Sequence, residues 1–339
     1  MLFPNQTLLS LRRDPRFAGG KGWITYFTPT WNRASFLERP YQSLLAQTDT
    51  HFVWVVVIDG STDASEEEAL RLLRLEQIPM LVCSRSRNEG KHKAFRYALE
   101  RCETEFFACM DDDDRYAPEA TACFLEAWKA LRAEGPADVG AVRARVQRED
   151  GSLLSAPAPL RGSRAAAPER PFDCSTLDFR YKFGLAEENW TCYSVEALRS
   201  VDLFSEGYYL ADRHRFFSEA VWQGRFARRW RCRYIPEVLR TYSTDAPSSL
   251  SRPAPSRQAL LDKLINNCLL YREQYDYIGR YLPLGLRLRR LLWMSSVRSK
   301  LGLPWKPFVS SFPSRPLRRW LCAFRPLGAL WPRPSVPRQ

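Results

Sequence analysis

Short apolar runs alternate with amphipathic stretches through the first part of this chain. Each apolar run is rich in β-branched or aromatic residues and has the length of a buried strand. Apolar residues then recur three and four positions apart, which is the spacing of one helix face. This alternation predicts right-handed βαβ units, and therefore an α/β fold with a mainly parallel central sheet and helices on both faces. The predicted strands span residues 23–28, 53–58, 80–84 and 105–110.

Several helix starts are predicted from local composition. The Ser-x-x-Glu spacing of a capping box occurs at residues 35–38 and again at residues 65–68. Pro118 suits the first position of the helix that follows the fourth strand. A further helix is expected to begin near Arg213, because apolar residues then recur at helical spacing.

Polar residues follow each of the four predicted strands. In an open parallel sheet, ligands bind beyond the carboxyl ends of the strands, where the loops converge. We therefore expect a ligand site at this edge of the sheet. The loops that would form it are residues 29–33, 59–63, 87–91 and 111–114.

The last of these loops consists of four consecutive aspartates, residues 111–114. Like charges at the end of a buried strand repel one another unless a cation lies between them. Carboxylate oxygens suit Mg²⁺ and Mn²⁺, which proteins hold with one or two carboxylates together with substrate phosphates. The cluster thus predicts a divalent metal, Mn²⁺ or Mg²⁺, beside a nucleotide diphosphate. The alternative is an acidic turn that precedes the helix at Pro118.

Taken in order, these loops resemble the donor-binding half of family 2 glycosyltransferases. The resemblance is close over residues 22–128 and looser to about residue 245. It implies a GT-A-like fold and transfer of a sugar from a nucleotide-diphosphate donor with inversion. One departure is Ile58, which replaces the first Asp of the family's Asp-Asp-Gly, whereas Asp59 keeps the second. The matching segments are PTWNR at 29–33, LLAQT at 44–48, IDGSTD at 58–63, NEGK at 88–91 and DDDD at 111–114.

The resemblance also implies roles for individual residues. Asp59 would receive the nucleobase edge, and Lys91 would meet the donor phosphates, with a solvated surface lysine as the alternative. Asp113, together with Asp111, would be the metal ligand of the Asp-x-Asp pair. The full set of predicted donor-binding residues is Pro29, Thr30, Asn32, Arg33, Asp59, Asn88, Lys91, Asp111 and Asp112.

Inverting transfer by single displacement requires a carboxylate base that takes the proton of the acceptor hydroxyl. Residues 217–222 resemble the Pro-Glu-x-x-Trp element of one bacterial subgroup of the family, although Ser218 replaces the proline. We therefore predict Glu219 as the catalytic base, with a plain surface glutamate as the alternative. Asp212 is the second catalytic candidate, and its alternative role is to cap a helix.

The net charge of +13 is concentrated at the C-terminus, since residues 281–339 contain twelve Lys and Arg but no Asp or Glu. Basic residues mixed with Trp, Phe and Leu are typical of an anchor on an anionic membrane surface. Membrane recruitment is thus the prediction for the tail. A helical cover packed on the catalytic domain and a disordered basic end are the alternatives. No nucleic-acid partner is expected, because no nucleic-acid motif accompanies the charge.

The chain carries nine scattered cysteines, no apparent leader and no apolar run of membrane-spanning length. These features predict a cytoplasmic protein, peripheral on the inner face of the membrane. The predicted divisions are an N-terminal extension (1–21), a GT-A domain (22–245) with donor and acceptor halves (22–135 and 136–245), and a basic helical or flexible tail (246–339).

The predicted function is sugar transfer from a nucleotide-diphosphate donor, a UDP-sugar, to a glycan or glycolipid acceptor in polysaccharide biosynthesis. One alternative is a non-catalytic, membrane-recruited protein that binds nucleotide sugars; it would keep Asp59 and the aspartate cluster but lack a working base. A sugar-phosphate nucleotidyltransferase is a weaker alternative, because its Gly-rich signature loop is missing near the N-terminus.

Overall fold

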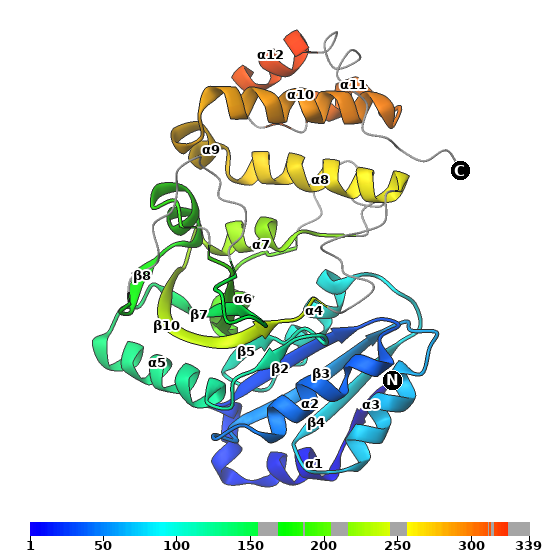
Figure 1. Ribbon diagram of the computed structural model, residues 1–339, viewed down its shortest axis with the longest axis vertical. Coiled ribbons are helices and arrows are strands. Elements are labelled where there is room, and N and C mark those ends of the chain that lie inside the picture. Colours follow the sequence, from blue (N-terminus) through cyan, green and yellow to red (C-terminus); the bar gives the residue numbers. More distant parts are fainter. Residues whose placement is uncertain are drawn as a thin grey trace.

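The computed structural model describes residues 1–154, 169–185, 187–204, 216–244, 256–310, 312 and 315–324. Within these residues, a sheet of ten strands forms the centre of the protein (Figure 1). Four of the strands were predicted from the sequence, each to within two residues of its ends. They are β2 (Ile24–Thr30), β3 (Phe52–Asp59), β4 (Met80–Arg85) and β5 (Phe106–Cys109).

The sheet combines a parallel half with a mixed half. Strands β4, β3, β2 and β5 lie side by side in that order and run parallel. β9 runs antiparallel to β5 and β7, whereas β7 and β10 run parallel. Antiparallel β1 and β6 lie at the two ends of the strand order, and β8 pairs with β10. The remaining strands are β1 (Leu2–Pro4), β6 (Arg115–Tyr116), β7 (Val139–Arg148), β8 (Phe172–Cys174), β9 (Asn189–Ser194) and β10 (Arg231–Tyr242).

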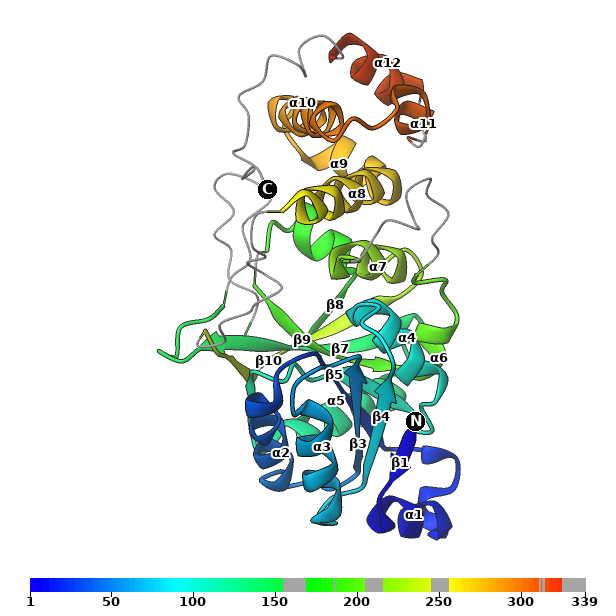
Figure 2. The same ribbon diagram turned by 90° about the vertical axis from the view of Figure 1, so that its right-hand side faces the viewer.

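Helices cover both faces of the sheet, as Figure 2 shows for α2 and α3 on one side and α4 on the other. The chain passes from β2 to β3 to β4 in one direction and then returns to place β5 beside β2. Right-handed crossovers therefore put α4 on the opposite face from α2 and α3. The helices along this part are α1 (Gln6–Arg13), α2 (Glu38–Leu45), α3 (Ser65–Arg74), α4 (Lys91–Glu100), α5 (Ala120–Glu134), α6 (Val195–Arg199) and α7 (Glu219–Phe226), with shorter turns at Pro15–Gly20 and Asp178–Lys182.

The two faces form separate buried clusters because β3 lies between them. Every residue of β3 is buried, and alternate side chains point to opposite faces. Val53, Val55 and Val57 join the cluster that contains Phe95 of α4. Trp54, Val56 and Ile58 join the cluster that contains residues of α2, α3 and α5. A buried apolar strand of this kind explains why the hydrophobic runs predicted the parallel strands well.

The predicted capping boxes are wrong. α2 begins at Glu38, after a 3-10 turn at Ala34–Phe36, and no side chain caps it. The backbone N–H of Ala34 donates instead to Asp63, from the loop after β3. Ser65 is the first residue of α3, and its hydroxyl accepts from the N–H of Arg33. At the start of α3, Asp63 Oδ1 accepts from the N–H of Ser65 at 3.0 Å, so Asp63 rather than Ser65 supplies the local contact.

The two other helix starts also differ from the prediction. α5 begins at Ala120, two residues after Pro118. α7 begins at Glu219 rather than near Arg213, which lies outside the described residues. Residues 216–218 have no regular secondary structure, and Ser218 occupies the position before the helix with an extended backbone. Glu219 is consequently the first residue of α7, and its side chain tilts toward the N-terminal end of the helix.

The C-terminal region forms a stack of helices on top of α7, visible in both views (Figures 1 and 2). Leu264, Met294, Phe308 and Leu321 belong to the same buried cluster as Phe95 of α4. The helical C-terminal extension predicted from the sequence is therefore present and packs on the domain. No helix in the described part of the chain is long and apolar enough to cross a membrane. These helices are α8 (Arg257–Glu273), α9 (Tyr275–Tyr281), α10 (Leu284–Lys300), α11 (Trp305–Ser310) and α12 (Arg315–Phe324).

Candidate functional site

The carboxyl ends of the four parallel strands meet at one edge of the sheet, as the sequence predicted. The first two loops at this edge are joined by Asn32, whose positive φ of 52° is a conformation that Asn tolerates. Its Oδ1 accepts from the N–H of Thr62 at 2.7 Å, and its N–H donates to Ser61 Oγ at 3.0 Å. Asn32 thus fixes the shape of this edge. Pro29 and Thr30 lie directly before it at the end of β2.

Arg33 binds two of the four aspartates. Its Nη1 lies 2.9 Å from Asp112 Oδ1, and its Nη2 lies 2.8 Å from Asp113 Oδ2. Burial raises the pKa of Asp112 to about 7, despite the opposing charge of Arg33. The second oxygen of Asp112, Oδ2, is buried and has no hydrogen-bond partner within the part of the chain that the structure describes. The sequence placed Arg33 in the nucleotide pocket, and the structure puts it against the aspartate cluster.

Asp111 lies between two cations. Lys91 Nζ is 2.7 Å from its Oδ1, and Arg240 Nη2 is 2.7 Å from its Oδ2. Burial would raise the pKa of Asp111, but the charges of Lys91 and Arg240 outweigh it and lower that pKa. Both oxygens of this carboxylate are therefore engaged by protein cations.

Arg240 also binds Asp114, whose side chain is fully buried. Arg240 Nε donates to Asp114 Oδ2 at 2.6 Å, and the N–H of Ser243 donates to Asp114 Oδ1 at 2.9 Å. Burial raises the pKa of Asp114 to about 6 against the effect of Arg240. These contacts give Asp114 a structural role, because they tie the aspartate loop to the end of β10.

Asp59 ends β3 and is only 4% exposed. Its carboxylate accepts from Arg85 Nη1 at 2.8 Å and from the N–H of Gly90 at 2.7 Å. Burial raises the pKa of Asp59, although the Gly90 N–H and Arg85 counteract it. Asp59 thus supports the loop after β4, in which Asn88 accepts from the same Gly90 N–H at 3.0 Å. Its predicted contact with a nucleobase stays a prediction.

Lys91 links Glu219 to the aspartate loop. Lys91 Nζ lies 2.8 Å from Glu219 Oε1, so one ammonium group bridges Asp111 and Glu219. The Glu219 side chain is 48% exposed, and Oε2 has no partner in the described part of the chain. Asp212, the second predicted catalytic residue, lies outside the described residues. A cavity of about 60 Å³ is lined by Lys91, Asp111 and Glu219 together with Arg240, Trp190 and Gln223.

The same region of the chain matches a known family. Residues 25–203, just over half of the 339 residues, match the family described as glycosyl transferase family 2. The chain belongs to glycosyl transferase family 2. This confirms the family predicted from the loop motifs, and it supports the predicted enzyme class, a transferase.

Curated relatives match about a third of this family 2 chain or less. An uncharacterized glycosyltransferase of Rickettsia bellii (strain RML369-C) is 30% identical over 95 residues, which cover 28% of this chain and 13% of the relative. The uncharacterized glycosyltransferase alr2836 of Nostoc sp. (strain PCC 7120 / SAG 25.82 / UTEX 2576) is 31% identical over 107 residues, covering 31% and 33%. The matched part thus spans about a third or less of these relatives.

Structural similarity to known proteins covers more of the chain than sequence similarity does. S. aureus TarS 1-349, solved in complex with UDP-GlcNAc, is similar to this family 2 chain with a TM-score of 0.53 at 16% identity. The similarity covers 90% of this chain and 89% of that chain. It confirms the predicted GT-A-like fold class together with its helical C-terminal region.

The residues of the aspartate loop can be tested for fit with the predicted metal. In the described part of the chain, no group of three or more His, Cys, Asp or Glu side chains gathers to hold a metal ion alone. Among the described residues, Asp113 Oδ1 has no protein partner, and neither has Asp112 Oδ2. Hard cations accept such oxygens and complete their coordination with substrate phosphates. The residues therefore fit a metal held by Asp113 and a donor diphosphate better than one held by Asp111.

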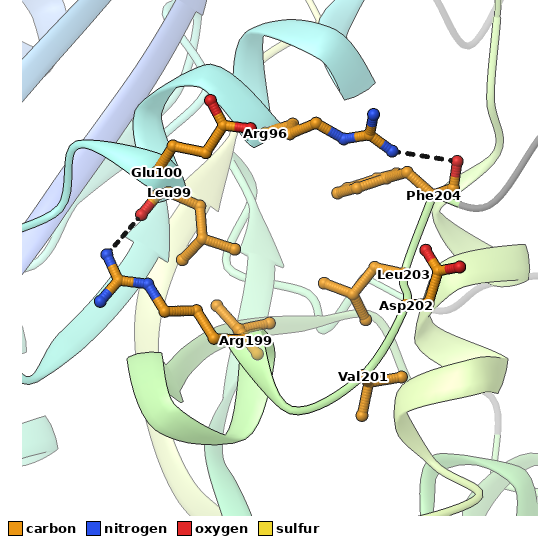
Figure 3. A pocket seen from close by; sticks show the side chains of 9 residues that line it. Arg96, Leu99, Glu100, Arg199, Val201, Asp202, Leu203 and Phe204 are labelled. Atoms are coloured by element: carbon orange, nitrogen blue, oxygen red, sulfur yellow. Dashed lines mark hydrogen bonds between the residues drawn. The ribbon is translucent and has the colours of Figure 1, made fainter.

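A larger cavity of about 300 Å³ lies at the far end of α4 (Figure 3). Arg96 and Arg199 border it, and each donates to a backbone carbonyl, of Phe204 at 3.2 Å and of Leu99 at 2.8 Å, respectively. None of the predicted site residues in the described part of the chain lines this cavity. The candidate site is therefore the smaller cavity at the sheet edge, where the charged groups converge.

The sequence analysis missed Arg240 as a member of the site, and the structure adds Trp190 to the lining of the same cavity. Arg240 comes from β10, more than a hundred residues after the aspartates that it binds. Trp190 Nε1 donates to the carbonyl of Cys109 at 2.6 Å, which fixes it beside the end of β5. The looser family resemblance, which extends to about residue 245, covered Arg240 but singled out no side chain there.

Proposed function

We propose that this family 2 protein transfers a sugar from a UDP-sugar to a hydroxyl of a glycan or glycolipid, with inversion at the anomeric carbon. The observation that carries the proposal is the bridge formed by Lys91 between Asp111 and Glu219. A single side chain, Lys91, thus connects Glu219, from the half predicted to bind the acceptor, with Asp111 at the end of β5. Charged groups for donor and acceptor chemistry therefore share one cavity.

In the proposed reaction, Glu219 Oε2 takes the proton of the acceptor hydroxyl. The acceptor oxygen forms a bond to the anomeric carbon while the bond from that carbon to the donor diphosphate breaks. Lys91 and Arg240 supply positive charge near the departing diphosphate. A divalent metal, when bound by Asp113, would stabilise the negative charge of the leaving nucleotide.

UDP is the proposed nucleotide because a protein of the same fold, S. aureus TarS, was solved with UDP-GlcNAc. In this chain, Asp59 would accept from the nucleobase, and Pro29, Thr30, Asn32, Arg33 and Asn88 would shape the nucleotide pocket. Asp111 and Asp112 would orient Lys91 and Arg33 toward the phosphates.

Calorimetric titration tests this proposal directly. UDP and then GDP are added to the parent protein and to Asp113→Asn, with and without Mn²⁺. Metal-dependent binding of UDP by the parent, lost in the variant, is expected. If neither nucleotide binds to the parent at any metal concentration, the proposed donor site is wrong.

We also propose that the basic tail, residues 246–339, recruits the protein to the anionic cytoplasmic face of a membrane. In α12, Leu321 is buried against the helical stack, whereas Arg319 and Trp320 are exposed. An exposed pair of one basic and one aromatic side chain suits a membrane interface.

Sedimentation with vesicles of anionic and of neutral lipid tests membrane recruitment on the full chain. The double variant Arg319→Glu, Trp320→Ser should bind anionic vesicles more weakly than the parent. Arg74→Glu, an exposed charge reversal on α3, is the matched control and should bind like the parent. Equal binding of anionic vesicles by the parent and the double variant would contradict the proposed membrane recruitment.

A further inference from the structure

Lys91 occupies a position that no single predicted role explains. It is the first residue of α4, and its ammonium group contacts one carboxylate of the donor side and one of the acceptor side. Burial would lower the pKa of Lys91, but the charge of Asp111, followed by other acidic groups including Glu219, outweighs it, so that pKa is raised. The ammonium is thus charged and shared between Asp111 and Glu219.

We infer that Lys91 is a positioning residue that holds Glu219 until the donor diphosphate competes for the same ammonium group. This inference rests on the proposed function, because it takes Lys91 as a phosphate ligand and Glu219 as the base. In the free protein, Glu219 is tethered to the donor side. Once the diphosphate engages Lys91, the carboxylate is released to meet the acceptor hydroxyl.

The geometry favours competition over simultaneous contact. Two carboxylate oxygens already lie 2.7 and 2.8 Å from the Lys91 nitrogen, one from Asp111 and one from Glu219. A phosphate oxygen that takes either of these positions displaces the carboxylate that holds it. Of the two, Asp111 is held by a second cation, Arg240, whereas Glu219 has no other partner in the described part of the chain. Glu219 is therefore the contact that yields.

Two features allow Glu219 to leave Lys91 and keep its negative charge. It is the first residue of α7, where the N-terminal end of the helix favours a negative side chain. Its side chain is 48% exposed, so water can hydrate the freed carboxylate. Gln223 lies one turn further along α7, and its Oε1 accepts from the buried Arg143 at 3.0 Å, which anchors the helix while Glu219 moves.

A double-mutant cycle on UDP affinity tests the inference without an acceptor. The parent, Glu219→Gln, Lys91→Met and the double variant are titrated with UDP at one fixed Mn²⁺ concentration. Removing the competing charge should make UDP bind about threefold or more tightly in Glu219→Gln than in the parent. In the Lys91→Met background, the same change at position 219 should leave UDP affinity unaltered.

The control variant is Glu237→Gln, which removes one exposed carboxylate from β10 and should bind UDP like the parent. Tightening by Glu219→Gln that persists in Lys91→Met would mean simple charge repulsion and would overturn the inference. Unchanged UDP affinity in Glu219→Gln would overturn it as well. If the parent binds no UDP, the proposed function itself fails, and the cycle separates that result from the other two.

Discussion

Arg33 Nη2 lies 2.8 Å from Asp113 Oδ2, and this ion pair joins the loop after β2 to the loop after β5. The contact occupies one oxygen of Asp113 and leaves Oδ1 for a metal ion. Asp113→Asn should therefore lower Mn²⁺-dependent UDP affinity by at least about tenfold. The control for loss of one negative charge is Asp150→Asn, because Asp150 is exposed and lies in a turn. Equal UDP affinity of Asp113→Asn and the parent, measured by calorimetry with Mn²⁺, would contradict the metal assignment.

Glu219→Gln should abolish turnover without weakening donor binding. Loss of a general base costs on the order of 100- to 10,000-fold in rate. The measurement is release of UDP from a UDP-sugar in the presence of acceptor, followed in the parent and the variant. A residual rate close to that of the parent would show that another group takes the proton, and would favour Asp212.

Asp59→Asn should weaken UDP binding about 10- to 100-fold, because a charge-assisted hydrogen bond to the nucleobase is lost. The pKa of Asp59 is raised by burial, so acid should protonate it at a higher pH than an exposed aspartate. The charged form is the acceptor, so this part of the affinity is present above the folded-state pKa and is lost as the pH falls through it.

The pH test compares UDP affinity of the parent and Asp59→Asn over the same range. The UDP phosphates titrate equally in both titrations, so the difference between the two curves reports Asp59. The difference should shrink on acidification. A difference that stays constant with pH would mean that the Asp59 charge plays no part in binding.

Arg240→Met should destabilise the fold strongly. It would leave Asp114, which is fully buried, and Asp111 without their shared cation. Breaking a buried pair from one side costs about 3–5 kcal/mol. Arg115→Met is the matched control, because Arg115 pairs with Glu149 at the surface, and both side chains are about half exposed; its cost should stay below about 1 kcal/mol. Denaturant unfolding of both variants measures the two costs, and similar values would refute the structural role of Arg240.

Gly60→Ala should disturb the donor edge more than a glycine replacement elsewhere. Gly60 has a φ of +67°, and an added Cβ would lie 2.2 Å from the backbone carbon of Arg87. Gly135 has a φ of +80°, but its added Cβ would meet nothing within 4 Å. Gly135→Ala thus isolates the cost of the left-handed backbone, about 1 kcal/mol. Thermal unfolding should show a clearly larger loss for Gly60→Ala, and equal losses would argue against the steric contact.

The sequence alone determined the parallel half of the sheet and the sheet edge at which the candidate residues meet. Hydrophobic periodicity is a local property, and runs such as residues 53–58 are buried on both faces whatever packs against them. The carboxyl ends of parallel strands then meet at one edge by geometry. Asp59, Lys91 and Asp111 were predicted at that edge and lie there.

Only the tertiary structure decided which charges pair. Ser35 and Ser65 had the local spacing of caps, yet Ser35 lies in a 3-10 turn and the Ser65 hydroxyl accepts from Arg33 of another loop. Arg240 reaches Asp111 across 129 positions of the chain. Ion pairs of this kind depend on which strand ends the fold brings together. The local sequence around each residue does not predict that. The aspartate cluster predicted that a cation lies beside it. The tertiary structure places three protein cations there, from Arg33, Lys91 and Arg240.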